Sequence, residues 1–99
     1  MAYKLTVEAS DDLRAIYAYS IETFGDAQAE RYQIELDACF KLIAKNPGIG
    51  RPVNNKLSRQ WRRHPHGSHV VVYEVDGTTV LILAVAHMSN LSKIRQFDP

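Results

Sequence analysis

Three β-prone segments between Arg59 and His87 constrain the fold of this 99-residue chain more than any other feature. The dipeptide Asp76-Gly77 is the strongest hairpin signal, because a type I′ turn needs positive φ at both of its central residues. The segment Pro65–Gly67 predicts a looser turn before it. The sequence therefore predicts three consecutive antiparallel strands.

Both faces of the last two predicted strands are largely apolar. Side chains alternate between the faces of a strand, which puts Val71, Tyr73 and Val75 on one face and Val70, Val72 and Glu74 on the other. The same alternation separates Val80, Ile82, Ala84 and Ala86 from Leu81, Leu83, Val85 and His87. An antiparallel sheet with one solvated face should alternate apolar and polar residues, so we expect both faces of this sheet to be covered.

The N-terminal half predicts a short strand followed by two helices. Tyr3–Glu8 alternates and is β-prone, and Ser10 is a good N-cap for a first helix that ends at Gly25. Its apolar stripe is Leu13, Ile16, Tyr17, Ser20 and Phe24. Asp26 is expected to cap a second helix that stops before Pro47, with the stripe Ala29, Tyr32, Leu36, Cys39, Phe40 and Ile43. Two amphipathic helices with almost no loop between them predict a helical hairpin.

This order of elements predicts one α+β domain over residues 1–99, with the N-terminal strand and the helical hairpin packed on an antiparallel sheet. The segment Pro47–Pro52 is expected to be an irregular linker, and Ser89 or Asn90 to start a short C-terminal helix or tail. Two helices cover one face only, so the other face should present part of Val70, Val72, Leu81, Leu83 and Val85. An apolar face rimmed by Arg62 or Arg63 and His87 would suit an amphipathic segment of a partner.

Charge is unevenly distributed along the chain. Residues 1–46 contain eight acidic and five basic residues, whereas residues 47–99 contain three acidic and seven basic ones, for a total of +1. This asymmetry predicts an acidic partner for the sheet side. The single Cys39 excludes an internal disulfide and is typical of a reducing compartment, and we find neither a membrane-span pattern nor a signal peptide. We therefore expect a cytoplasmic protein.

No strong metal, phosphate or catalytic motif is present. The segment His64–His69 holds three histidines but offers no carboxylate or thiolate, so we expect neither a metal nor a cofactor. Gly48-Ile49-Gly50 lacks the spacing of a nucleotide-binding loop. The arginines Arg59, Arg62 and Arg63 have two open interpretations, a charged edge strand or a site for an anion or acidic peptide.

Five stretches resemble the ParE branch of the RelE/ParE toxin superfamily. They are Asp12–Tyr19, Phe24–Tyr32, Asn46–Arg51, Gly67–Tyr73 and Val85–His87, and the resemblance spans Tyr3 to about Asn90. It implies a RelE/ParE-like fold and a plasmid or chromosomal toxin of a type II toxin–antitoxin system. Such a toxin would form a hetero-oligomer with a ParD-like antitoxin and inhibit DNA gyrase by binding, without catalytic residues and without membrane or sequence-specific nucleic-acid binding.

Two alternatives remain at this point. RelE-like toxins cleave mRNA on the ribosome, and that chemistry needs basic residues and a terminal tyrosine or histidine as acid or base. The tail carries Phe97 instead, although Arg62, Arg63, His64 and His87 could in principle form a nuclease site. The third interpretation is a homologue that binds an antitoxin but is not toxic. The residues expected to bind the antitoxin or target are Arg51, Arg59, Arg62, Arg63, Leu83 and His87.

Overall fold

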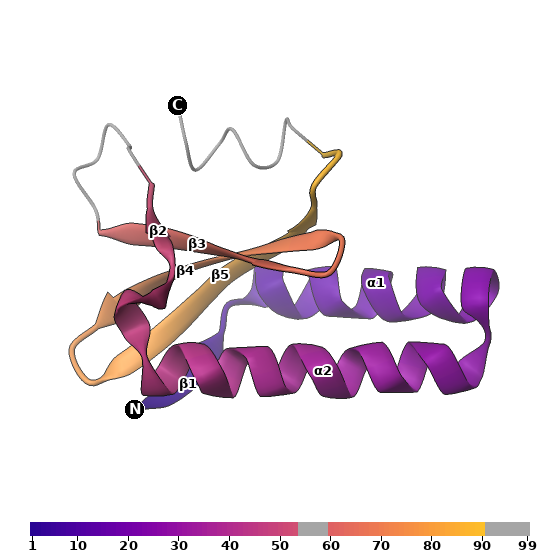
Figure 1. The fold of residues 1–99 in the computed structure, drawn as a ribbon, viewed down its shortest axis with the longest axis horizontal. Coiled ribbons are helices and arrows are strands. Elements are labelled where there is room, and N and C mark those ends of the chain that lie inside the picture. Colours follow the sequence, from indigo (N-terminus) through magenta and orange to yellow (C-terminus); the bar gives the residue numbers. More distant parts are fainter. Residues whose placement is uncertain (54–59, 91–99) are drawn as a thin grey trace.

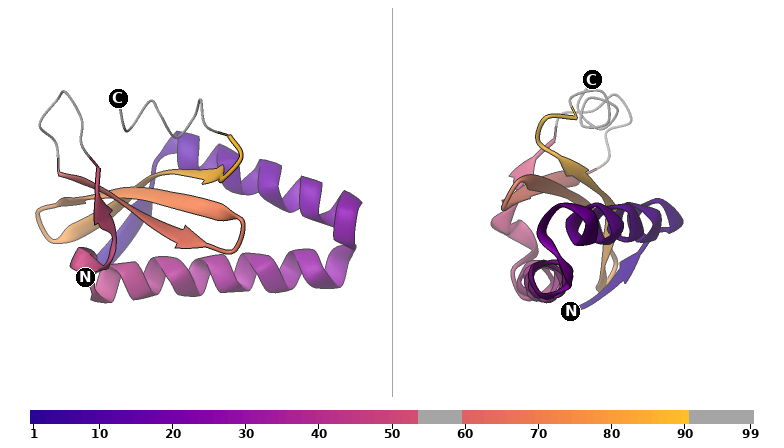
Figure 2. Two further views of the ribbon diagram at one scale, coloured as in Figure 1. Left: turned by 45° about the horizontal axis from the view of Figure 1, so that its top comes forward. Right: turned by 90° about the vertical axis from the view of Figure 1, so that its right-hand side faces the viewer.

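The computed structural model describes residues 1–53 and 60–90, which form a helical hairpin and a five-stranded sheet. The elements are β1 (Ala2–Leu5), α1 (Val7–Phe24), α2 (Asp26–Lys45), the 3₁₀ turn η1 (Pro47–Ile49), β2 (Arg51–Pro52), β3 (Trp61–His66), β4 (His69–Asp76) and β5 (Thr79–His87). The strand order is β1-β5-β4-β3-β2. Both helices lie on the same side of the sheet (Figure 1, Figure 2). The predicted α+β architecture with two layers is confirmed.

The sheet is mixed rather than antiparallel, because β1 pairs in parallel with β5 through neighbours such as Leu5 and Ile82. The helical hairpin then carries the chain from β1 at one edge to β2 at the opposite edge. The three strands predicted in residues 59–87 are confirmed as β3, β4 and β5, which pair antiparallel. The segment expected to be an irregular linker instead contains η1 and the two-residue strand β2.

A β-bulge in β5 changes which side chains face the helices. Val72 pairs with Ala84, whereas the next residue of β4, Tyr73, pairs with Ile82, so Leu83 is the extra residue. Val80, Ile82 and Val85 belong to the core cluster beneath the helices. The prediction that Val85 lies on the opposite face is therefore wrong, because one inserted residue reverses the alternation beyond it.

Helix α1 begins four residues earlier than expected. Its N-cap is Thr6 instead of Ser10, and the Thr6 hydroxyl accepts from the Ala9 amide at 3.0 Å while it donates to the Leu83 carbonyl at 3.0 Å. The hydroxyl thus joins the start of α1 to the bulge in β5. Gly25, at φ 89°, ends α1 and immediately precedes α2, so Asp26 is the first helical residue and makes no capping bond through its side chain.

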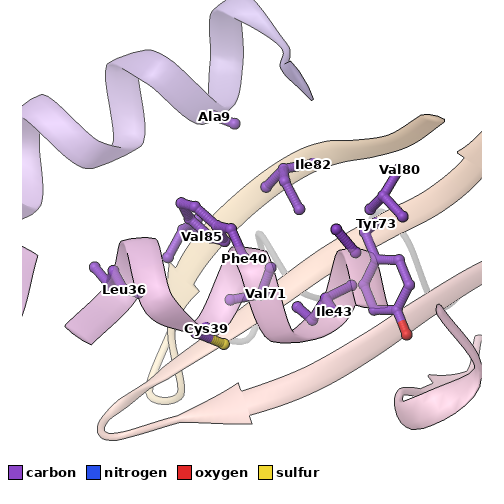
Figure 3. Packing of buried hydrophobic residues seen from close by; sticks show 11 residues of the cluster. Ala9, Leu36, Cys39, Phe40, Ile43, Val71, Tyr73, Val80, Ile82 and Val85 are labelled. Atoms are coloured by element: carbon purple, nitrogen blue, oxygen red, sulfur yellow. The ribbon is translucent and has the colours of Figure 1, made fainter. Parts of the chain in front are cut away.

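The core lies between α2 and the strands β4 and β5 (Figure 3). Leu36, Phe40 and Ile43 of the predicted α2 stripe are at most 2% exposed. The α1 stripe is only partly confirmed, because Tyr17 and Phe24 are exposed whereas Ser20 is buried. Neither helix in the described part of the chain is long and apolar enough to cross a bilayer.

The two hairpin loops differ slightly from the predictions. Asp76 pairs with Thr79, so the loop is Gly77-Thr78, one residue later than expected, and Gly77 has φ 62°. His66 pairs with His69, so the first loop is Gly67-Ser68 and Pro65 lies inside β3. Pro65 is tolerated there because β2 ends its pairing with β3 before this position, which leaves Pro65 at an edge that needs no donor.

Candidate functional site

A buried tyrosine anchors the turn between α2 and β2. The Tyr73 hydroxyl donates to the Pro47 carbonyl at 2.7 Å and accepts from the Gly50 amide at 2.8 Å. A Cβ at Gly50 would lie 2.6 Å from this hydroxyl oxygen, so the close approach requires glycine. Burial raises the pKa of Tyr73, which keeps its hydroxyl protonated as a donor.

Arg62 belongs to the same arrangement. It pairs with Tyr73, on the side of the sheet that faces the helices, and its guanidinium donates to the Gly50 carbonyl at 2.6 Å. A longer bond reaches the Gly48 carbonyl at 3.4 Å. We call Pro47–Gly50, Arg62 and Tyr73 the turn latch. The sequence suggested Arg62 as a binding residue, which stays a prediction. In the structure its guanidinium bonds to carbonyl groups of the turn.

Arg51 and Arg63 lie directly across from each other on the face away from the helices. Arg63 also pairs with Val72, which pairs with Ala84, so one cross-strand row joins two arginines to two apolar residues. In the neighbouring row, the Trp61 indole donates to Glu74 at 2.9 Å. We call the pair Arg51 and Arg63 the arginine pair. Arg59 lies outside the described residues.

The centre of this second face is less open than expected. Val72 and Ala84 are 1% and 0% exposed, whereas Val70 and Leu81 are half-buried. Leu83 is half-buried at the bulge, where its carbonyl accepts from Thr6. The expectation that Val72 is presented to a partner is therefore wrong, and Leu83 lies within a β5 irregularity rather than a regular exposed row.

Three histidines come together at the end of the sheet that carries the β3–β4 loop. His66 pairs with His69, and His69 pairs with His87, so one residue from each of β3, β4 and β5 lies in a single row. The rings of His69 and His87 meet edge to face with centroids 5.3 Å apart. His87 was expected at the rim of a site with Arg62 or Arg63, but the structure pairs it with His69 instead.

Tyr32 of α2 completes this group. Its hydroxyl lies 2.6 Å from His69 Nδ1 and 3.2 Å from the His66 carbonyl oxygen. The loop passes so close that a Cβ at Gly67, which has φ 55°, would lie 2.9 Å from the Tyr32 hydroxyl oxygen. Sequence reasoning treated Tyr32 as core and the histidines as a turn. A two-residue loop at Gly67-Ser68 would have predicted the histidine pairing, but the contact with Tyr32 depends on tertiary packing.

These residues line a cleft between the helical hairpin and the end of the sheet. Its deeper part has a volume of about 240 Å³ and is lined by Tyr19, Ser20, Phe24, Gln28, Tyr32, Ser68, His69 and His87. A shallower part shares Tyr19, His69 and His87 and continues along α1 to Asp12. We call both parts the His–Tyr cleft. No lysine or arginine lines either part in the described residues.

Burial favours the neutral forms of His69 and Tyr32 in the free protein. Burial lowers the pKa of His69, and the neighbouring His87 and His66 lower it further. Burial also raises the pKa of Tyr32, an effect that a hydrogen bond with the Ser68 backbone partly offsets. The structure shows no group of three or more histidine, cysteine, aspartate or glutamate side chains arranged to hold a metal within residues 1–53 and 60–90.

The fold matches solved toxin–antitoxin structures. It is similar to a chain of the chromosomal ParDE system from P. aeruginosa, with a TM-score of 0.73 and 20% identity over 88% of this chain and 95% of that one. It is also similar to a chain of the RelBE2 complex from Mycobacterium tuberculosis, with a TM-score of 0.62 and 22% identity over 87% and 95% of the two chains. The architecture is therefore that of the RelE/ParE-like proteins.

Sequence comparison narrows this class. Residues 3–91 match the family model for the ParE toxin of the type II toxin–antitoxin system parDE. Toxin ParE1 of Caulobacter vibrioides is 44% identical over 87 residues, which cover 88% of each chain. Toxin ParE1 of Mycobacterium tuberculosis is 33% identical over 86 residues, which cover 86% of this chain and 87% of the relative. The chain belongs to the ParE toxin family of type II toxin–antitoxin systems.

Proposed function

We propose that this chain inhibits DNA gyrase in the cytoplasm and is neutralised by a ParD-like antitoxin, with which it forms a hetero-oligomer. Membership of the ParE family carries the proposal. The solved relatives of the same fold include a ParDE system and a RelBE2 toxin–antitoxin complex, which supports a protein partner for this chain as well.

The arrangement of charged and titratable groups supports inhibition by binding over RNA cleavage. RNA cleavage needs a general acid and a general base, with cationic side chains next to them that stabilise the charge on the phosphate. Here Arg63 pairs with Val72 on one face, whereas His87 pairs with His69 at the end of the sheet and lines a cleft without arginine or lysine among its described residues. Arg62 is engaged in the turn latch.

The arginine pair is the part of the sheet best suited to an acidic antitoxin segment. Arg51 and Arg63 are cross-strand neighbours, so this part of the sheet carries two positive charges that a partner carboxylate would complement. The half-buried Val70 and Leu81 on the same face would add apolar contact. The partner's charge would mainly set orientation and association rate, and its apolar residues would set the dissociation rate.

The gyrase proposal is tested by two assays on one preparation. Purified gyrase with supercoiled plasmid should accumulate linear DNA when the chain is added, after denaturant and protease release the cleaved complex. Ribosomes with a defined mRNA should show no new cleavage. The control is the same chain bound beforehand to the protein encoded by the adjacent open reading frame, which should suppress the effect on gyrase.

Each other pattern of results has a definite meaning. Cleavage of mRNA without cleavage by gyrase would replace the proposal with a RelE-like activity. Antitoxin binding without either activity would identify a non-toxic homologue. A folded chain that fails to bind the adjacent protein would contradict the antitoxin part of the proposal.

A further inference from the structure

The His–Tyr cleft offers hydrogen-bond donors to a ligand. The backbone amide of Ser89, which can only donate, lies 3.1 Å from His87 Nδ1, so this nitrogen accepts. A neutral His87 therefore carries its hydrogen on Nε2. His69 likewise uses Nδ1 toward Tyr32, which leaves its Nε2 for another partner.

The hydrogen-bond network around Tyr32 fits both protonation states of His69. When His69 is neutral, the Tyr32 hydroxyl donates to Nδ1 across 2.6 Å. When His69 is protonated, Nδ1–H donates to the hydroxyl oxygen, and the hydroxyl turns to donate to the His66 carbonyl at 3.2 Å. In each state both His69 Nδ1 and the Tyr32 hydroxyl hydrogen have a hydrogen-bond partner, so protonation of His69 requires only that the hydroxyl turn.

The charged surroundings decide where an anion would bind. The cleft is lined by Asp12 and Tyr19 from α1, by Tyr32 from α2 and by His69 and His87 from the strands, and the His66 ring packs against Tyr32. Glu35 acts on Tyr32 through charge, raising its pKa. Asp12 lies at the shallow end, where it accepts from the Val85 amide at 2.9 Å. The histidine end is therefore the place for an acidic group.

The cleft has room for a side chain of a partner. Its deeper part has a volume of about 240 Å³, and the shallower part, at about 440 Å³, continues it along α1. Tyr19 and Phe24 are 62% and 54% exposed at its wall, and such aromatic surface is typical of pockets that receive an anchor residue.

We propose that the His–Tyr cleft receives an acidic side chain of the antitoxin, flanked by an apolar residue, and takes up a proton when it does so. This inference rests on the proposed antitoxin binding and adds a second contact region beyond the arginine pair. The carboxylate accepts from Nε2 of His69 and His87, and the flanking apolar residue packs against Phe24 and Tyr19. The partner's charge stabilises the protonated histidine, so the complex holds more protons than the separated proteins.

This linkage gives affinity a defined pH dependence. Because the complex binds the additional proton, antitoxin affinity should rise as pH falls from 8 to 6. One proton taken up corresponds to a change of at most about tenfold per pH unit. The acidic residue of the antitoxin stays ionised throughout this range, so the histidine end alone sets the trend.

Calorimetric titration of the full chain with the protein encoded by the adjacent open reading frame tests the proposal. Measurements at pH 6, 7 and 8, each in two buffers of different ionisation enthalpy, give affinity and proton uptake together. Wild type should bind more than tenfold more tightly at pH 6 than at pH 8, with net proton uptake. His69→Gln and His87→Gln should each reduce the trend and the uptake. His64→Gln, in the same strand system but outside the cleft, is the matched control.

The possible outcomes separate this inference from the antitoxin proposal. Tight binding with no proton uptake, or uptake that persists in both cleft variants, would overturn the inference and leave the proposed function intact. No binding by folded wild type at any pH would overturn both. His87 is exposed, so His87→Gln provides a folded test even where His69→Gln is unstable. Replacing the antitoxin's acidic residues one by one should identify a single position that abolishes uptake.

Discussion

Two tyrosines at opposite ends of the sheet make similar contacts but have different roles. Tyr73 is fully buried, and both of its hydroxyl hydrogen bonds go to backbone groups of the turn latch. Tyr32 is half-buried, and its hydroxyl bonds to an ionisable side chain beside an open cleft. In each case a glycine makes the approach possible, Gly50 for Tyr73 and Gly67 for Tyr32. The Tyr73 hydroxyl therefore stabilises a turn, whereas the Tyr32 hydroxyl contacts a side chain whose protonation can change.

The largest expected difference between the two ends concerns stability. Tyr73→Phe would leave the Gly50 amide and the Pro47 carbonyl without their partner, and each unsatisfied buried group costs about 1–3 kcal/mol. We expect a loss of about 2–5 kcal/mol in the free energy of unfolding. Tyr32→Phe should cost only about 1 kcal/mol, because His69, which loses the hydroxyl as a partner, lies beside a cleft that admits water. Denaturant titration of both variants measures this, and equal losses would contradict the distinction.

Arg62 and Arg63 should also differ in the property that their replacement changes. Arg62→Gln should destabilise the protein by about 1.5–3 kcal/mol, because it removes a charged donor from the Gly50 carbonyl. Arg63→Gln should slow antitoxin association, with an effect that shrinks as salt rises. Thermal melts and stopped-flow association rates provide the two measurements. An unchanged melting temperature in Arg62→Gln would show that the turn latch does not depend on this residue.

The smallest expected effect is the pH dependence of the free protein. The pKa of His69 is lowered in the folded state, so the unfolded chain binds more protons between the folded and unfolded pKa values. Stability should therefore be fully present above the ordinary histidine pKa of about 6.5 and should fall as the pH drops below it. His69→Gln should remove this decline, and denaturant titrations at pH 7.5 and 5.5 would detect it. The trend is opposite to that expected for antitoxin affinity.

The sequence predicted the layers and the hairpins because periodicity and turn residues are local. Phe40 and Ile43 follow a helical stripe, and the Asp-Gly turn joins β4 to β5 as expected apart from a one-residue shift. The bulge at Leu83 escaped prediction because β5 is apolar on both faces, so its alternation carries no information about register. The parallel pairing of β1 with β5 was not predicted either, because the sequence of a four-residue strand does not identify the distant strand with which it pairs.

The two functional regions were predicted unequally. The role of the expected basic residues in binding stays a prediction. The structural difference between Arg62 and Arg63 depends on the position of the turn latch, which local sequence does not encode. The histidines were recognised as a cluster and interpreted as a turn. Their significance comes from Tyr32, which lies 37 residues from His69 along the chain and meets it only through packing of α2 against the sheet.

The histidine resonances of this chain, followed by NMR from pH 5 to 9 in the free and antitoxin-bound states, test the central claim most directly. We expect His69 to titrate below the ordinary histidine range when the chain is free and its pKa to rise when the antitoxin binds. A His69 pKa that is the same in both states would contradict the assignment of the His–Tyr cleft as a proton-linked binding site.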